Sequence, residues 1–212
     1  MIGKWFGKKE TSVRRLEHPE DLMPGDMFDL VDSFGLPEAL RGKTFKVVLV
    51  NTYEYEYGKE TEFLLEGESG EPYHMTIDLE DGEKYVNFTM KIERDEVEAL
   101  FDMEAFSAIF DDQPGDEPIQ TTAKKSAYDK WVANVYHRDG DWTRGYFHQS
   151  DCRRQTFSQF EDDKAEPFES ISLVSDDDMH SVEIEVWPNG ETDVSLCVSR
   201  PIADIKELYG KT

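Results

Sequence analysis

The feature that most constrains the fold is a two-residue alternation of apolar and polar side chains, repeated in short segments. In residues 73–79, for example, every second residue is apolar. Such alternation is typical of a β-strand with one buried face and one wet face. The pairs Asp81-Gly82 and Asn189-Gly190 lie between such segments and tolerate the positive φ angles of tight hairpins. The pattern therefore predicts antiparallel β-meanders.

Helical spacing is confined to two places. Over residues 94–110, apolar side chains recur at intervals of three and four residues, which predicts one helix or two short ones. A short closing helix is expected from Ile202 to Tyr209, after the strand signals end. We therefore predict a mainly β fold of the α+β class, with two or three short helices.

Segments rich in charged and turn-forming residues predict the domain organisation of the chain. Residues 1–22 are polar and partly basic, so we expect a flexible arm there. Acidic residues, prolines and a glycine gather in 111–122, which predicts a linker. It would separate a β-rich lobe at 23–110, closed by a helix, from a second β-rich lobe at 123–212 with a C-terminal helix. A single sandwich or an open barrel is the alternative layout.

Charge restricts the partners of the 212-residue chain. Asp and Glu number 47 against 23 Lys and Arg, which gives a formal net charge of -24. A surface of this charge repels nucleic-acid phosphates, so no direct nucleic-acid binding is expected. It suits cationic partners such as basic proteins, polyamines or divalent metal ions. Solubility alone is the simpler explanation.

The chain has no segment of the length and apolarity that a bilayer span requires. Its N-terminus lacks the apolar run of a secretory signal, and its two cysteines are too few for a disulfide framework. A cytoplasmic protein without a transmembrane segment is expected.

Familiar catalytic motifs are missing from the sequence. The P-loop, the Gly-x-Gly-x-x-Gly fingerprint, Gly-x-Ser-x-Gly and His-Glu-x-x-His are all absent. Each of these motifs encodes a mechanism. The sequence therefore favours a non-enzymatic protein, and no cofactor is expected.

One group of residues has the side chains of a metal site. Residues 128–137 and 142–149 are expected to be strands joined by a hairpin turn, with His137 and His148 on either side of that turn. Cys152 follows closely, and imidazole and thiolate groups together bind zinc. The alternative is that the two histidines are ordinary half-buried hairpin residues.

A second candidate site is a stripe of tyrosines. Tyr53, Tyr55 and Tyr57 alternate with glutamates, so a strand would place all three rings on one face. We call these three residues the tyrosine stripe. It predicts an aromatic platform for a cation or a peptide. A cross-strand aromatic ladder that covers the core is the alternative.

The order of several turn and strand signatures resembles a known family. Its elements are Leu22-x-Pro24-Gly25-Asp26 before a β-meander, and Trp187-Pro188-Asn189-Gly190-Glu191 leading to Val194 and a closing segment from Ile202 to Leu208. This order resembles the YjfK-like family of uncharacterised bacterial proteins. The resemblance implies a cytoplasmic accessory protein, tied to the envelope or to a membrane-stress partner.

These observations favour an accessory or binding protein of the bacterial cytoplasm that acts through protein–protein contacts. Its partner would be a protein, basic or membrane-associated. Two alternatives stay open. One is a small enzyme or metal-binding protein that uses the His and Cys cluster. The other is an acidic nucleic-acid mimic, whose carboxylates would form a long surface stripe.

Overall fold

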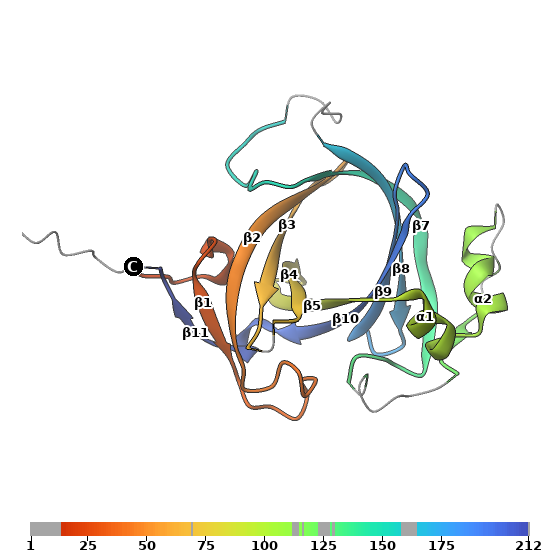
Figure 1. Cartoon of the computed structure of the whole chain (residues 1–212), viewed down its shortest axis with the longest axis horizontal. Coiled ribbons are helices and arrows are strands. Elements are labelled where there is room, and N and C mark those ends of the chain that lie inside the picture. The colour runs from red at the N-terminus through yellow and green to blue at the C-terminus, as the bar shows by residue number, and fades with distance from the viewer. Residues whose placement is uncertain are drawn as a thin grey trace, which may run out of the picture.

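The computed structural model describes residues 14–68, 70–111, 115, 117–122, 128, 130–157 and 165–211. It confirms a mainly β fold with antiparallel strand pairing and two short α-helices (Figure 1). The strands are β1 (Met27–Leu30), β2 (Thr44–Tyr55), β3 (Gly58–Glu66), β4 (Pro72–Glu80), β5 (Glu83–Ile92), β6 (Ile119–Gln120), β7 (Val135–His148), β8 (Glu166–Ser175), β9 (His180–Val186), β10 (Thr192–Pro201) and β11 (Ile205–Tyr209). The helices are α1 (Arg94–Leu100) and α2 (Met103–Ser107), with 3-10 turns at Pro19–Asp21, Ala108–Phe110 and Ile202–Asp204.

Eight of the strands close into a barrel. Neighbours are hydrogen-bonded in the order β2-β3-β4-β5-β10-β9-β8-β7. The end of β2 then pairs with the end of β7, from Thr52 opposite His148 to Tyr55 opposite Gly145. Figure 1 looks into the resulting ring. The other half of β2 pairs with β1, which carries β11, and the start of β7 pairs with β6.

The apolar face of these strands points out of the ring and is covered. Side chains such as Phe63, Met75 and Phe88 lie on it and are almost completely buried. On one side β1, β11 and the N-terminal segment cover the sheet, and Phe28 stacks on Phe45 with 5.8 Å between ring centroids. Towards β7, α1 and α2 lie outside the ring (Figure 1). The hydrophobic core therefore surrounds the barrel.

The polar face points into the ring, which we call the lumen. Strands β3 and β9 lie opposite each other in the strand order, yet their side chains interact. Glu62 of β3 raises the pKa of Glu185 on β9, and Glu183 of β9 raises that of Glu60 on β3. Only side chains that point into a common interior reach each other across a closed ring. Many of these inward side chains are polar and half-buried, so the lumen is lined by polar groups.

Two predicted elements are different in the structure. The predicted hairpin turn at residues 138–141 was wrong, because β7 continues through it. Asp139 pairs with Ser172 and Thr143 with Ser170, so the residues between form a bulge instead of a turn. The predicted helix from Ile202 to Tyr209 was also wrong. A 3-10 turn leads into β11, which pairs with β1 and thereby covers the edge of that strand.

Strand pairing joins the two segments that we predicted as separate lobes. β5 of the first segment pairs with β10 of the second, and β2 pairs with β7. One sheet therefore runs through residues 23–110 and 123–212. In the predicted linker, residues 112–114 and 116 lie outside the described part of the chain.

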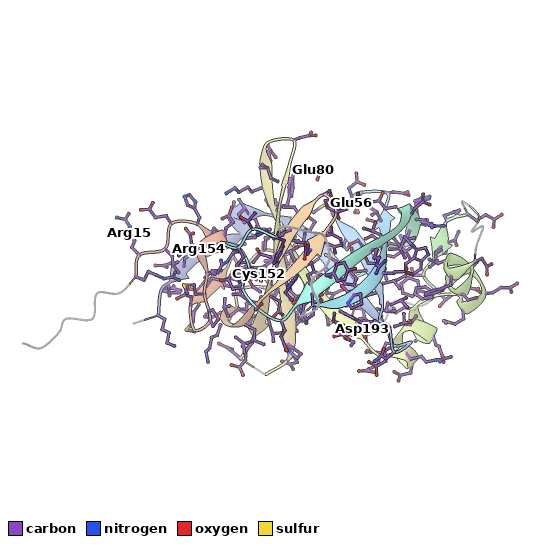
Figure 2. The ribbon with its side chains drawn as sticks, turned by 90° about the horizontal axis from the view of Figure 1, so that it is seen from above. Arg15, Glu56, Glu80, Cys152, Arg154 and Asp193 are labelled. Atoms are coloured by element: carbon purple, nitrogen blue, oxygen red, sulfur yellow. The ribbon has the colours of Figure 1, made fainter. Side chains whose placement is uncertain are left out.

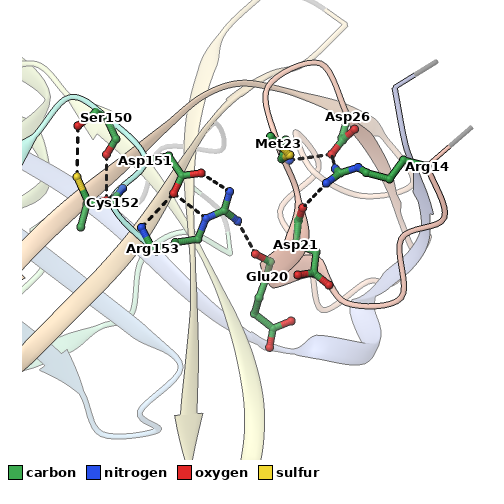
Figure 3. A network of polar contacts seen from close by, with 10 residues as sticks. Arg14, Glu20, Asp21, Met23, Asp26, Ser150, Asp151, Cys152 and Arg153 are labelled. Carbon is green, nitrogen blue, oxygen red and sulfur yellow. Dashed lines mark hydrogen bonds and ion pairs between the residues drawn. The ribbon is translucent and has the colours of Figure 1, made fainter. Parts of the chain in front are cut away.

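The predicted N-terminal arm is described from residue 14 onward, where it lies against the sheet. Leu22 is fully buried, and Arg14 contacts the carboxylate of Asp26. A polar clasp ties this segment to the loop after β7 (Figure 3). In it, Arg153 is bound by the Asp151 carboxylate at 2.6 Å and donates a hydrogen bond to the carbonyl of Glu20. The first 13 residues of the predicted arm lie outside the described residues.

Among the described residues, no helix combines the length and apolarity needed to cross a bilayer. Figure 2, turned by 90°, shows that the hairpin of β4 and β5 stands out beyond the body of the molecule, with Glu80 near its tip.

Candidate ligand site in the barrel

The tyrosine stripe runs from the rim of the barrel into the lumen. Tyr53 and Tyr55 lie on the inward face of β2, and Tyr57 follows in the turn to β3. The rings stack in series, with centroids 6.4 Å apart for Tyr53 and Tyr55 and 5.1 Å for Tyr55 and Tyr57. Tyr57 is 80% exposed, whereas the other two are half-buried. The stripe therefore forms a stack of aromatic rings that begins at the exposed turn and continues along the inward face of β2.

Further aromatic rings hold the inner end of the stripe. Tyr53 packs on Phe147 of β7 and edge-on against Phe168 of β8, at centroid distances of 5.0 and 5.3 Å. Phe168 reaches this position because Gly145, its cross-strand partner, has no side chain. A Cβ atom at Gly145 would lie 2.5 Å from the Cζ atom of Phe168. The glycine therefore makes the aromatic cluster possible.

Four glutamates face this cluster from two opposite walls. Glu60 and Glu62 occupy alternate positions on β3, and Glu183 and Glu185 do so on β9. On the first wall, Glu62 accepts a hydrogen bond from the Asn51 side chain at 2.9 Å. On the second, Glu183 accepts hydrogen bonds from the hydroxyls of two serines, Ser172 and Ser181.

Burial and the charges of neighbouring carboxylates raise the pKa of Glu60, Glu183 and Glu185. Burial, together with the charge of Asp78, raises the pKa of Glu60 to about 8. Burial and the charge of Glu62 raise the pKa of Glu185 to about 7, and burial raises that of Glu183. Burial is also the main reason why the pKa of Tyr53 is well above its ordinary value, with Glu62 and Glu185 adding to it. A positive charge at this place would relieve the repulsion.

One basic side chain touches the glutamate cluster directly. The Nδ1 atom of His74 lies 2.8 Å from the Glu62 carboxylate. Burial lowers the pKa of His74, but the hydrogen bond and the charge of Glu62 together raise it above its ordinary value. Nearby, Lys91 pairs with Asp193 at 2.6 Å. Both cations are thus already paired with a carboxylate.

Asn51 leaves an acceptor open on the lumen wall. Its side chain is 5% exposed, and its Nδ2 atom is committed to Glu62. Among the described residues, its Oδ1 atom has no hydrogen-bond partner. A buried carbonyl oxygen without a donor is costly, so this atom is an acceptor available to an N–H or O–H group.

The predicted metal ligands are not assembled into one site. His137 and His148 lie on the same strand, an odd number of residues apart, and therefore on opposite faces. His137 pairs with Asp176 at 2.8 Å near the surface, and His148 pairs with buried Glu54 at 2.8 Å outside the ring. No group of three potential metal ligands occurs within the described ranges.

Cys152 is a buried residue of the loop that covers the outward face of β2. Its backbone N–H donates to the Thr52 hydroxyl at 2.9 Å, and Lys59 binds its carbonyl at 2.8 Å. The Sγ atom lies 3.4 Å from the Ser150 hydroxyl. These contacts anchor the loop on the barrel, which is a structural role.

Sequence analysis found the tyrosine stripe but missed the glutamates opposite to it. The alternation that marks Glu183 and Glu185 as one face of a strand is visible in the sequence. It predicts a wet face, and a wet face is ordinarily the outside of a sheet. Closure of the ring turns that face inward, and no local pattern encodes the closure.

Neither a family model, a curated protein nor a solved structure matches this chain. The function therefore has to be inferred from the chemistry of the lumen.

Proposed function

We propose that this is a non-enzymatic binding protein that takes a small organic cation into the lumen of its barrel. One observation carries the proposal: the tyrosine stripe and four glutamates face the same interior space. This proposal builds on the predicted aromatic platform for a cation. The rings of the platform lie next to the negatively charged side chains of the lumen.

Two physical effects favour a cation over a neutral or anionic ligand. The faces of tyrosine rings attract cations, and more strongly where water is excluded. Burial, followed by the charges of neighbouring carboxylates, raises the pKa of Glu60 to about 8 and that of Glu185 to about 7. A cation would offset this repulsion and take the place of a proton. The lumen carboxylates would repel an anion, as they repel each other.

Binding of organic cations to the purified protein tests the proposal. Isothermal titration calorimetry at about pH 8 would compare a primary alkylamine, a quaternary ammonium ion and an alcohol of the same size. We expect both cations to bind and the alcohol to give no heat. Glu60→Gln removes one lumen carboxylate and should weaken cation binding by about tenfold or more.

Glu56→Gln is the matched control for this experiment. Glu56 lies in the turn between β2 and β3, just before the strand that carries Glu60, and is exposed at the surface (Figure 2). Its substitution should leave the affinity unchanged. The proposal is refuted if neither cation binds, if the alcohol binds as well as the amine, or if both variants weaken binding equally.

A protein partner is a second element of the proposed function. The net charge of -24 favours a basic or membrane-associated protein on the outer surface. Affinity capture at low and at moderate salt tests it, because an association driven by charge weakens steeply with ionic strength. A partner retained equally at both salt concentrations would contradict charge-driven binding.

A further inference from the structure

We propose that a cavity at the start of β2 binds an arginine side chain of a protein partner. This inference rests on the protein partner in the proposed function, and it names the surface that the partner contacts and the residue that this surface recognises. It follows from three features of the cavity: its size, its aromatic floor and the negative charge of its rim.

The cavity lies between the segment that precedes β2 and the turn that joins β3 to β4. Residues of both segments line it, and its volume is about 160 Å³. A cavity of about 150 Å³ is large enough to hold benzene, so this one accommodates a single side chain and not a folded element. The tyrosine stripe belongs to the other end of β2, and the cavity is therefore separate from the cation site in the lumen.

Two aromatic rings form the floor of the cavity. Phe45 and Tyr73 meet edge-on with their centroids 5.8 Å apart, and both are almost completely buried. Gly67 lines the cavity beside them. A Cβ atom at this glycine would lie 3.2 Å from the Cε1 atom of Phe45, so the glycine leaves the space next to that ring open. Such a floor suits the methylene stem of a long basic side chain, which packs on apolar surface while its charged head stays in contact with polar groups.

Three glutamates and one lysine surround the floor. Glu38 comes from the segment before β2, and Glu68 and Glu71 come from the turn between β3 and β4. All three are exposed, and none of them has an ion pair or a side-chain hydrogen bond with another described residue. Lys43 supplies one positive charge against their three negative charges. The rim is therefore acidic and attracts a cationic side chain.

Arginine fits this arrangement better than lysine does. Burial, followed by the charge of Glu71, raises the pKa of Tyr73, so this carboxylate acts close to the floor. Glu38 lines the cavity from the other segment. A guanidinium group carries five N–H donors in a planar fork and can bond carboxylates in two directions, whereas an ammonium group is a compact point charge. The guanidinium group is also more weakly hydrated, which lowers the cost of moving it onto an apolar floor.

Three short peptides that differ in one side chain provide the test. NMR chemical-shift mapping on the isotope-labelled full chain would compare acetyl-Gly-Gly-Arg-Gly-Gly-amide with the peptides that carry lysine or citrulline at the central position. Citrulline keeps the shape of arginine without its charge. We expect the arginine peptide to bind at least about tenfold more tightly than the citrulline peptide, with the largest shifts at Phe45, Gly67 and Tyr73. Equal binding of the citrulline or the lysine peptide would overturn the proposal.

Variants show whether the cavity is the place of binding. Glu38→Gln and Glu71→Gln should each weaken binding of the arginine peptide by about threefold or more, as expected for the loss of an exposed ion pair. Glu56→Gln is the matched control, because it removes the same charge at the other end of β2 and should leave the affinity unchanged. Gly67→Val fills the space next to Phe45 without any change in charge and should abolish the shifts.

The outcomes separate this inference from the proposed function. If Glu60→Gln weakens binding of the arginine peptide and the cavity variants do not, the peptide enters the lumen, so the inference fails while the cation site stands. If the peptide does not bind at all, the inference fails alone, because alkylamine binding in the lumen is a separate measurement. A partner captured equally well by wild type and by Gly67→Val would place the protein interface elsewhere, so the inference would fail while the protein partner stands.

Discussion

Single carboxyl groups in the lumen are costly to ionise. Burial raises the pKa of both Glu60 and Glu183, and the charge of Glu183 adds to the rise at Glu60. Buried acids with strongly raised pKa values cluster at functional sites. This agrees with the proposed cation site in the lumen.

The first prediction concerns Glu60 and pH. Its pKa is raised from 4.5 to about 8 in the folded protein, so between these values the folded state holds a proton that the unfolded state has lost. Stability should therefore fall as pH rises through this window, by at most about 1.4 kcal/mol per pH unit for this group. Urea unfolding of wild type and Glu60→Gln at about pH 5 and 8 checks it. The variant should gain stability relative to wild type at the higher pH, and an equal gap at both values would contradict it.

Ligand binding should depend on pH in the opposite direction. Glu60 and Glu185, with pKa values of about 8 and 7, must lose their protons before they pair with a cation. Affinity for an amine should therefore rise between about pH 6 and 8, by up to about tenfold per pH unit for each proton displaced. Calorimetry in buffers of different ionisation enthalpy measures the protons released. Binding without proton release would show that these carboxyl groups do not contact the ligand.

The third prediction at the scale of single residues concerns Gly145. In Gly145→Ala the new Cβ atom would lie 2.5 Å from Phe168, so that ring must move away from Tyr53 and Tyr55. We expect a loss of about 1–3 kcal/mol in the free energy of unfolding, as in overpacked cores. Chemical denaturation measures it. Gly115→Ala is the control, because a Cβ there meets no atom closer than 3.9 Å. Equal effects of the two substitutions would exclude steric crowding at Phe168.

At the scale of elements, local sequence patterns predicted most strands but not their more distant partners. The hairpin at Asp81 and Gly82 forms as expected, with positive φ at both residues. The helical region at 94–110 is also confirmed. The secondary-structure predictions were wrong where pairing with a distant strand determines the conformation of a segment. The C-terminal segment is a strand because β1 offers it an edge, and β7 passes through Gly140 because β8 pairs with both sides of the bulge.

The polar clasp leads to a prediction about the N-terminal segment. Arg153 binds Asp151 and the Glu20 carbonyl, and it lies over the Phe63 ring (Figure 3). Arg153→Ala should release residues 14–26 from the loop after β7, at a cost of about 1–3 kcal/mol. Hydrogen exchange should then be faster in that segment. Arg154→Ala, an exposed neighbour, is the control. Unchanged exchange in Arg153→Ala would show that other contacts hold the segment.

At the scale of the whole molecule, the barrel has its apolar core outside and its polar face inside. The alternating pattern predicted both faces of the strands but not which one would be enclosed. That assignment depends on the pairing of β2 with β7, whose residues are far apart in the sequence. The tyrosine stripe was therefore recognised as a candidate site, while Glu60, Glu62 and their counterparts on β9 were not. The predicted mimic of nucleic acid would need such carboxylates on the surface, and these four are in the lumen.

The division of β2 between two neighbours has a consequence for biosynthesis. Thr44 to Lys46 pair with β1, which the ribosome makes earlier, whereas Thr52 to Tyr55 pair with residues made much later. During translation, the second half of β2 therefore has a free edge until β7 emerges. The ring cannot close before that moment, so the lumen is among the last parts of the protein to be completed.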